Sequence, residues 1–299
     1  MTSIVCWLNQ DDYFGGLWAV SDSRVSGAGG ILTDNCPKLF AIHANSYRLT
    51  GDFLRRRPMR VLSFGFGFAG STLIGANVKE MLATILGDLR ELAYHDAPDY
   101  PFEERIPALA DIAKLARKLA ETYILSIGAH HPTNAKCELV IFGFCIKSSE
   151  FKVFRMSNNP EAPSSVGIED MPVSDRDLII LGDRKSAIRE RILSLRTRFE
   201  VGSANWRRAP ITTLAAILRE PERGSIGGYL QLCTAFRDDV RHLTITASGE
   251  GRFPFVGFDM YQDIGQIGGF LPVLSFGLSE PGPDGWSEPT RNPDDDAGR

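Results

Sequence analysis

The sequence predicts an α+β fold in which two antiparallel sheets face each other and each is covered by a helix pair, a four-layer αββα sandwich. Strand-like and helical segments follow one another in blocks, without the regular βαβ alternation that is typical of a parallel sheet. A chain of 299 residues, 43% of them hydrophobic, is long enough for one large core. Two facing sheets would bury the many apolar strand faces in a single domain, which we place at residues 1–278.

The first block, up to residue 67, consists of strands. "TSIVCWL" and "GGLWAVSDS" are apolar runs, and "NQDDYFGG" between them has the Asp and Gly content of a hairpin turn. The runs "LFAIHA" and "RVLSFGF" predict two more strands. Between these, an inserted basic segment at about residues 45–60 is expected to be an exposed excursion from a hairpin.

Two long helices are predicted next. Apolar residues from Ile74 to Leu92 recur at steps of three or four, which indicates a helix over residues 71–94. A second stripe runs from Leu109 to Tyr123, and Pro107 suits its first turn.

The remaining blocks are strands, two shorter helices and strands again. "CELVIFGFCI" and "FKVFRM" predict a hairpin, "NNPEAPSSVGIEDMP" a loop, and "DLIILG" a strand. Helices are expected from near Asp183 and over residues 211–218, followed by the strands "YLQLCTAF" and "HLTITAS". Residues 279–299 are rich in Pro, Gly and Asp, and we expect a disordered tail there.

The composition excludes several classes of function. A net charge of −4 gives no electrostatic footprint for nucleic acid, so no nucleic-acid partner is expected. No apolar run reaches the roughly 18 residues of a membrane span, and no targeting segment precedes the first strand, so we expect a cytoplasmic protein. The five cysteines form no CxxC pair, and we expect neither a metal nor a cofactor.

Four residues in the N-terminal part of the chain indicate a specific catalytic chemistry. Removal of Met1 would leave Thr2 with a free α-amine and a hydroxyl, a nucleophile and a base in one residue. Asp22 lies in "SDSR", Lys38 follows it by 16 residues in "CPKLFAI", and Gly70 lies in "GFAGST". This set resembles the proteasome β subunit and HslV family of N-terminal nucleophile hydrolases, with closest similarity to the longer, stand-alone bacterial proteasome homologues.

The resemblance implies an N-terminal threonine peptidase. Thr2 would attack the amide, with its own amine or Lys38 as proton acceptor and Asp22 orienting Lys38. The backbone N–H of Gly70 would receive the oxyanion, because a residue without a side chain lets the substrate approach closely. Phe68, Thr72 and Cys36 would lie near the pocket for the residue before the scissile bond.

The sequence departs from the family pattern at two places. Asp183 stands where family members usually present a serine. In "ERGSIGGYL", Ile226 precedes the two glycines where the family often has an Asp, two further residues and then Ser-Gly-Gly. Glu222 and Ser225 keep the three-residue spacing if the register slips by one, so Ser225, Glu222 and Asp183 are candidates for supporting the nucleophile.

Three functions remain open at this point. The first is a threonine peptidase inside a self-compartmentalised homo-oligomer, acting on peptides or unfolded proteins, with an ATPase unfoldase as a further partner. The second is an amidohydrolase that uses the same chemistry on a small amide, because fold does not fix substrate. The third is an inactive scaffold, in which Asp183 and Ile226 record lost activity.

Overall fold

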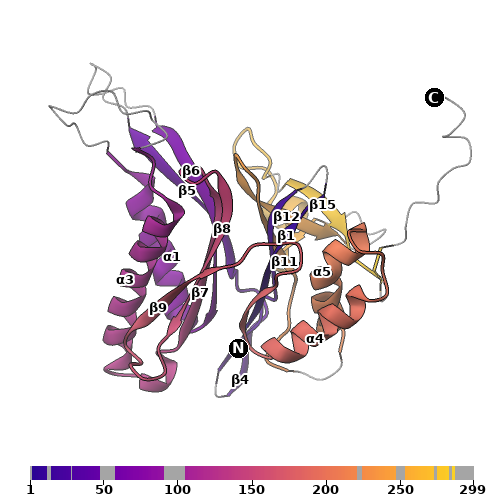
Figure 1. Cartoon of the computed structure of the whole chain (residues 1–299), viewed down its shortest axis with the longest axis horizontal. Helices are drawn as coiled ribbons and strands as arrows, with labels where there is room; N and C mark the ends of the chain where they lie inside the picture. The colour runs from indigo at the N-terminus through magenta and orange to yellow at the C-terminus, as the bar shows by residue number, and fades with distance from the viewer. Residues whose placement is uncertain are drawn as a thin grey trace, which may run out of the picture.

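The structure is a computed structural model, and it describes residues 2–11, 15–27, 29–47, 58–90, 105–220, 224–246, 253–272, 275–282 and 285–286. Two large sheets face each other across the middle of the molecule (Figure 1). One sheet has six strands in the order β10, β1, β2, β11, β12, β15, and the other has five in the order β5 to β9.

The six-stranded sheet is built from both ends of the chain. Its strands are β1 (Ser3–Asn9), β2 (Gly16–Ser21), β10 (Ile179–Gly182), β11 (Gln231–Ala235), β12 (Val240–Thr246) and β15 (Ser275–Ser279). The helices α4 (Lys185–Arg196) and α5 (Ala204–Leu218) lie on its outer side (Figure 1). Buried apolar residues of both helices and of β1, β2, β11 and β12 form one cluster there, so the helices are held by apolar burial.

The five-stranded sheet comes from the middle of the chain. Its strands are β5 (Leu39–Tyr47), β6 (Pro58–Gly70), β7 (Cys137–Cys145), β8 (Glu150–Asn158) and β9 (Val166–Met171), all antiparallel. The helices α1 (Thr72–Gly87) and α3 (Leu109–Gly128) cover its outer face (Figure 1). Ser71 caps α1 by accepting a hydrogen bond from the backbone N–H of Ile74 at 3.4 Å.

A third apolar cluster fills the space between the sheets. It includes Ile4, Leu17, Leu39, Val140 and Phe142, which come from β1, β2, β5 and β7. These strands therefore bury side chains on both faces, and their sequences are nearly continuous apolar runs.

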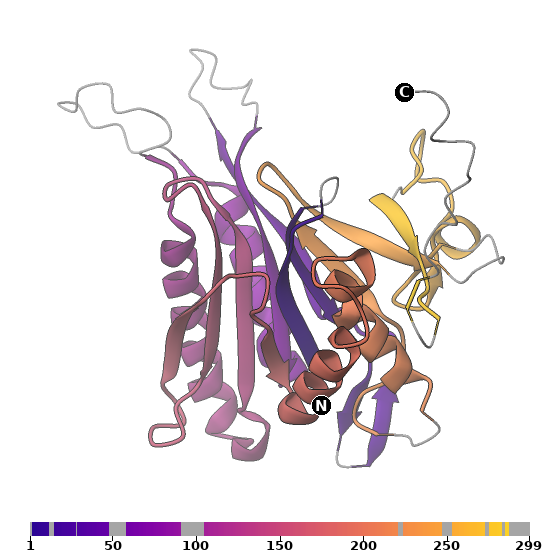
Figure 2. The same cartoon turned by 45° about the vertical axis from the view of Figure 1, so that its right-hand side comes forward.

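Smaller elements lie outside the two sheets. A two-stranded ribbon, β3 (Val25–Gly27) and β4 (Gly30–Thr33), projects at the lower end of the molecule in Figure 2. A second ribbon pairs β13 (Pro254–Phe255) with β14 (Phe258–Asp259), and a π-helical turn, η2 (Met260–Ile264), follows it. The 3₁₀ turn η1 (Pro132–Asn134) joins α3 to β7.

The predicted fold class, a four-layer αββα sandwich of two antiparallel sheets, is wrong. The six-stranded sheet is mixed, because β15 lies parallel to β12, with Leu243 opposite Ser275 and Ile245 opposite Leu278. The two ribbons and η2 belong to no layer, and among the residues that the structure describes, strand residues outnumber helical ones, 39% to 30%. The sequence order could not reveal this, because the parallel partner of β12 arrives from beyond a long irregular segment.

Most individual elements are confirmed, with some corrections. The strands expected near the N-terminus, the hairpin of β7 with β8, and α4 are all present. The segment predicted as a loop after β8 contains β9, whose exposed and buried residues do not alternate regularly. α1 ends at Gly87 instead of residue 94, and α5 starts at Ala204, well before residue 211.

Two expected segments fall largely on undescribed residues. Of the inserted basic segment, residues 48–57 lie outside the described part, and so do residues 287–299 of the expected tail. Contacts continue past Ser279, because the Asn205 side chain accepts from the N–H of Trp286 and donates to its carbonyl, both at 2.8 Å. Among the described helices, none combines the length and the apolar character that crossing a bilayer requires.

Candidate active site

Thr2 stands at the start of β1 and is held there by backbone contacts. Its carbonyl accepts a hydrogen bond from the backbone N–H of Asp183 at 2.8 Å, and only 4% of the residue is exposed. The next backbone N–H, that of Ser3, donates to Asp22 Oδ1 at 3.0 Å. This contact follows from the register, since Ile4 pairs with Ser21 and the chain then places Asp22 across from Ser3.

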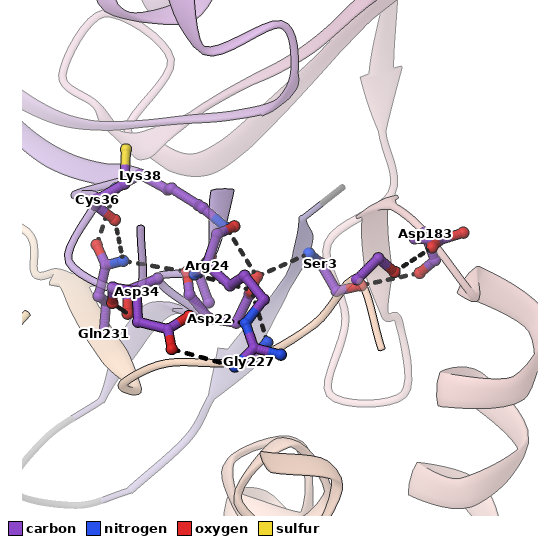
Figure 3. A network of polar contacts seen from close by, with 12 residues as sticks. Ser3, Asp22, Arg24, Asp34, Cys36, Lys38, Asp183, Gly227 and Gln231 are labelled. Atoms are coloured by element: carbon purple, nitrogen blue, oxygen red, sulfur yellow. Dashed lines mark hydrogen bonds and ion pairs between the residues drawn. The ribbon is translucent and has the colours of Figure 1, made fainter. Parts of the chain in front are cut away.

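Asp22 and Lys38 form an ion pair that is completely buried. Lys38 Nζ lies 3.1 Å from Asp22 Oδ1, and both side chains have 0% exposure. Lys38 Nζ also donates to the Arg24 carbonyl at 2.6 Å. Asp22 Oδ2 accepts from the backbone N–H groups of Arg24 at 3.2 Å and Gly227 at 3.1 Å (Figure 3). The carboxylate is thus partnered on both oxygens, as a buried charge requires.

Burial changes the protonation of Lys38. Loss of hydration lowers the pKa of the Lys38 ammonium, and the attraction of Asp22 opposes this only in part. A lysine with a lowered pKa has a larger neutral fraction near neutral pH. Only the neutral amine can accept a proton, so burial prepares Lys38 for base chemistry.

Gln231, which the sequence analysis did not identify, holds this pair in place. Its Oε1 accepts from the Lys38 backbone N–H at 2.9 Å and from that of Leu39 at 3.4 Å. Its Nε2 donates to the carbonyls of Asp22 at 3.1 Å and Cys36 at 2.9 Å (Figure 3). The available signal was a lone amide within the apolar strand "YLQLCTAF".

The loop that carries Gly227 closes over Asp22. The Gly227 carbonyl accepts from the N–H groups of Ser23 at 3.2 Å and Arg24 at 3.0 Å. The Arg24 side chain binds Asp34 at 2.7 and 3.1 Å and donates to the Gly224 carbonyl at 3.1 Å. A Cβ on Gly227 would lie 2.2 Å from Arg24 Cζ, so a larger residue here would displace the Arg24 guanidinium.

Asp183 and Ser225 meet beside the N-terminal strand. Ser225 Oγ donates to Asp183 Oδ2 at 2.5 Å, and the Arg184 N–H donates to Oδ1 at 3.0 Å. Ser3 Oγ donates to the Asp183 carbonyl at 2.8 Å (Figure 3). Of the three supporting residues predicted, these two come together next to Thr2, and Glu222 lies outside the described residues.

Gly70 reaches the neighbourhood of Thr2 through Gly182. Gly70 is the last residue of β6, with φ of +93°, and a Cβ there would lie 2.5 Å from the Lys136 carbonyl oxygen. Gly182 has φ of +86°, and its Cβ would lie 1.7 Å from the Thr2 carbonyl oxygen and 3.2 Å from Cβ of Ala69. Both positions need glycine: Gly70 lets the end of β6 lie close to the start of β7, and Gly182 lets the end of β10 lie close to Thr2.

The predicted pocket residues do not form one group. Phe68 is 1% exposed, stacks on Phe40 with ring centroids 6.1 Å apart, and packs against Gly75 of α1, so it belongs to the core under that helix. Thr72 is half-buried as the first residue of α1. Cys36 is half-buried near Lys38, and burial raises the pKa of its thiol. Phe68 therefore packs within the core under α1.

Within the described residues, no three acidic, histidine or cysteine side chains are grouped so that they could hold a metal ion. The buried cysteines Cys6, Cys137 and Cys233 have thiols whose pKa is raised by burial. Such thiols are protonated and inert. The titratable groups that meet near Thr2 are therefore Asp22, Lys38 and Asp183.

Comparison with known proteins identifies the fold. No family model matches the sequence, and no curated protein matches it. A similar solved structure is Anbu (ancestral beta-subunit) from Yersinia bercovieri, with 14% identity, 81% of each chain covered and a TM-score of 0.51. Anbu from Hyphomicrobium sp. strain MC1 gives 14% identity, coverage of 80% of this chain and 82% of that chain, and a TM-score of 0.48. The structure "Helical Assembly of the Anbu Complex" from Pseudomonas aeruginosa gives 16% identity, coverage of 78% of this chain and 80% of that chain, and a TM-score of 0.46.

These findings correct the family assignment made from the sequence. The resemblance to proteasome β subunits and HslV rested on short motifs around Thr2, Asp22, Lys38 and Gly70. No family model matches the sequence, and the similar structure with a TM-score above 0.5, that from Yersinia bercovieri, is described as Anbu (ancestral beta-subunit) and not as HslV. At 14% identity, the likeness to Anbu from Yersinia bercovieri concerns the fold alone. Function has to be argued from the site.

Proposed function

We propose that this chain is an N-terminal threonine peptidase that cleaves peptide bonds after removal of Met1. Thr2 Oγ attacks the scissile carbonyl carbon while its proton passes to the neutral Lys38 amine or to the Thr2 α-amine. The Gly70 N–H stabilises the oxyanion of the tetrahedral intermediate. The intermediate collapses to an ester on Thr2, the amine product leaves with the proton, and water then hydrolyses the ester.

The observation that carries the proposal is the buried ion pair attached to the N-terminal strand. Lys38 Nζ lies 3.1 Å from Asp22 Oδ1, and the same oxygen accepts from the N–H of Ser3, the residue after Thr2. Burying a charged pair costs free energy, so a structural role alone would be served as well by apolar residues. A base with a lowered pKa beside the first strand is what an N-terminal hydroxyl needs.

Asp183 and Ser225 support the same reaction from the other side of Thr2. The Asp183 carboxylate, held by Ser225 Oγ and the Arg184 N–H, is part of the segment that anchors the Thr2 carbonyl. A carboxylate there would stabilise the positive charge that forms when the α-amine takes the proton from Thr2 Oγ. In the proposal, Asp183 performs the supporting role and is not a mark of lost activity.

N-terminal mass and covalent labelling test the proposal together. The purified protein should lack Met1 and should gain the mass of an electrophile that bridges a hydroxyl and an amine, and it should hydrolyse short peptides. Thr2→Ala should abolish labelling and hydrolysis, while Thr2→Ser should retain both at a reduced rate.

Two outcomes would overturn the proposal. Retained Met1 with neither labelling nor hydrolysis would favour the inactive scaffold. Labelling at Thr2 with turnover of small amides but of no peptide in a library would favour the small-amide amidohydrolase.

Assembly into a homo-oligomer that encloses the sites is part of the same proposal. Large apolar side chains are exposed on the C-terminal segment, including Ile267 at 64% and Phe270 at 80%. Exposed apolar groups of this kind mark interaction surfaces. Light scattering of the purified chain should give a mass several times that of the 33.0 kDa monomer, and a monomer at micromolar concentration would contradict this part.

A further inference from the structure

A large apolar groove opens beside the candidate active site. It has a volume of about 920 Å³, and its walls come from the end of α3, the turn through η1, and the turn between β8 and β9. Apolar side chains line most of it, among them Leu125, Ala129, Pro132, Pro160 and Pro163. The volume lies within the range of sites that bind small molecules or side chains.

The groove begins at two glycines, of which Gly182 lies against Thr2. Gly70 and Gly182 both line it. Gly182 touches the Thr2 carbonyl oxygen, and Gly70 is the proposed donor to the oxyanion. A substrate whose carbonyl lies at Gly70 therefore has one of its two ends at the mouth of the groove.

The register of β6 indicates which end of the substrate that is. β6 runs between β5 and β7: Leu39 pairs with Gly67 on one edge, and Cys137 pairs with Gly70 on the other. Lys38 and Cys36 precede β5 and lie on the first edge, where we expect the residue before the scissile bond. The groove, lined by Cys137 and Glu138, lies on the second edge, so the two ends of a bound chain would diverge across β6.

The groove walls are held by polar bonds below the apolar lining. Asn158 Oδ1 accepts from the Cys137 N–H at 2.8 Å, and Asn158 Nδ2 donates to the carbonyls of Ala135 at 3.1 Å and Pro163 at 2.6 Å. This one side chain joins the turn before β7 to the turn after β8. The groove is thus formed in advance and needs no closure to bind.

We propose that this groove binds the apolar side chain that immediately follows the scissile bond, on the leaving-group side of the substrate. This inference rests on the proposed function, and it specifies the substrate class: peptides with a large aliphatic residue after the cleaved bond. The charged groups that line the groove do not argue for a charged side chain, because Glu138 is already bound by Lys185 at 2.6 Å and by the Gly182 N–H at 3.3 Å, and Lys136 is exposed to solvent.

The test compares quenched peptides that differ only in the residue after the cleaved bond, which is Leu, Gln or Glu. The unmodified protein should cleave the Leu peptide with a kcat/KM on the order of tenfold above the Gln peptide. Leu125→Arg, at a side chain that is 59% exposed, should remove that preference and raise cleavage of the Glu peptide relative to Leu. Leu193→Arg, on α4 and 46% exposed, is the matched control and should leave the preference unchanged.

A peptide that ends in a carboxamide supplies a substrate with no residue after the bond. Its hydrolysis, followed by ammonia release, should be equal in the unmodified protein and in Leu125→Arg. Equal cleavage of the Leu and Gln peptides, or an effect of Leu125→Arg on the residue before the bond instead, would overturn the groove assignment while leaving the peptidase proposal intact. Absence of hydrolysis and of Thr2 labelling would instead overturn the proposed function, and the groove assignment with it.

Discussion

Two neighbouring regions of this molecule differ in whether their side chains are bonded within the chain or left open to a partner. Around Asp22, charged and polar groups are buried and bonded within the chain: Lys38 binds Asp22 and the Arg24 carbonyl, and Gln231 binds four backbone groups. Past Gly70, the groove has apolar walls that nothing in the described chain fills. Gly182 lies where the two regions meet.

The difference separates two tasks. Polar groups fixed by internal bonds need no reorganisation when charge develops in a reaction, which is the main physical source of electrostatic catalysis. An open apolar surface releases free energy only when a partner covers it, so it suits binding. Substitutions around Asp22 should therefore affect stability and chemistry together, whereas substitutions of exposed side chains in the groove should affect selectivity alone.

The largest loss of stability is expected from Lys38→Met. It leaves the Asp22 carboxylate buried without its cation, which costs about 3 to 5 kcal/mol of unfolding free energy in urea titrations. Adding Asp22→Asn to this variant should restore part of the loss, because no buried charge is then left unpaired. Lys152→Met, which breaks contacts to Glu150 and Asp170 at the surface, is the control and should cost less than about 1 kcal/mol. Equal losses in the two lysine variants would contradict the comparison.

Acid should destabilise the protein through His242, a partly buried polar group that is less well satisfied than Asp22. Burial lowers the pKa of His242 to about 4, and its Nδ1 has no hydrogen-bond partner among the described residues. The folded state then binds fewer protons than the unfolded state between pH 6.5 and about 4, so stability is full above pH 6.5 and falls across this window. The total loss is roughly 3 kcal/mol.

Urea titrations between pH 7.5 and pH 4 check this prediction, with His242→Gln as the variant that removes the group. The variant should lose less stability on acidification than the unmodified protein. His43→Gln is the control: burial also lowers the pKa of His43, but the ring is half-exposed and bonded to Ser63, so its effect should be smaller. Parallel pH profiles for the unmodified protein and His242→Gln would show that another group is responsible.

Gln231→Ala should cost about 2 kcal/mol, because it leaves buried backbone groups at Lys38, Asp22 and Cys36 without partners. The proposed chemistry predicts a larger effect on activity than on stability, since Lys38 is then no longer positioned. Unfolding titrations give the first quantity, and the rate of Thr2 labelling gives the second. A variant that loses stability but labels at the normal rate would show that Gln231 supports the fold and does not position Lys38.

The sequence predicted the centre of the candidate site better than its surroundings. Thr2, Asp22 and Lys38 were found because residue type and spacing carry their chemistry, and the register of β1 with β2 brings Ser3 to Asp22. Gln231 was missed because its role depends on β11 pairing beside β2, a contact between residues about two hundred positions apart. No local pattern contains that information.

The errors in the fold have a similar origin. β9 was assigned to a loop because five of its residues are exposed or half-buried, so the apolar alternation that marks a strand is absent. β15 was not placed because its parallel pairing joins it to β12, a strand that lies far from it in the sequence. Phe68 was assigned to a pocket by position in a motif, and it packs under α1 instead.

The smallest effect on stability is expected in the groove, at Leu125. Ile124 and Leu125 are consecutive on α3 and both line the groove, yet Ile124 is 3% exposed and packs into the core while Leu125 is 59% exposed. Ile124→Ala should cost about 2 to 5 kcal/mol as a truncation in the core, and Leu125→Ala less than about 0.5 kcal/mol. If Leu125→Ala instead costs as much as Ile124→Ala in urea titrations, Leu125 holds α3 against the chain and the groove is not an open surface. If Leu125→Ala instead loses little stability but changes the preference for the residue after the cleaved bond, then Ile124 serves folding and Leu125 serves binding, although the two residues are adjacent on one helix.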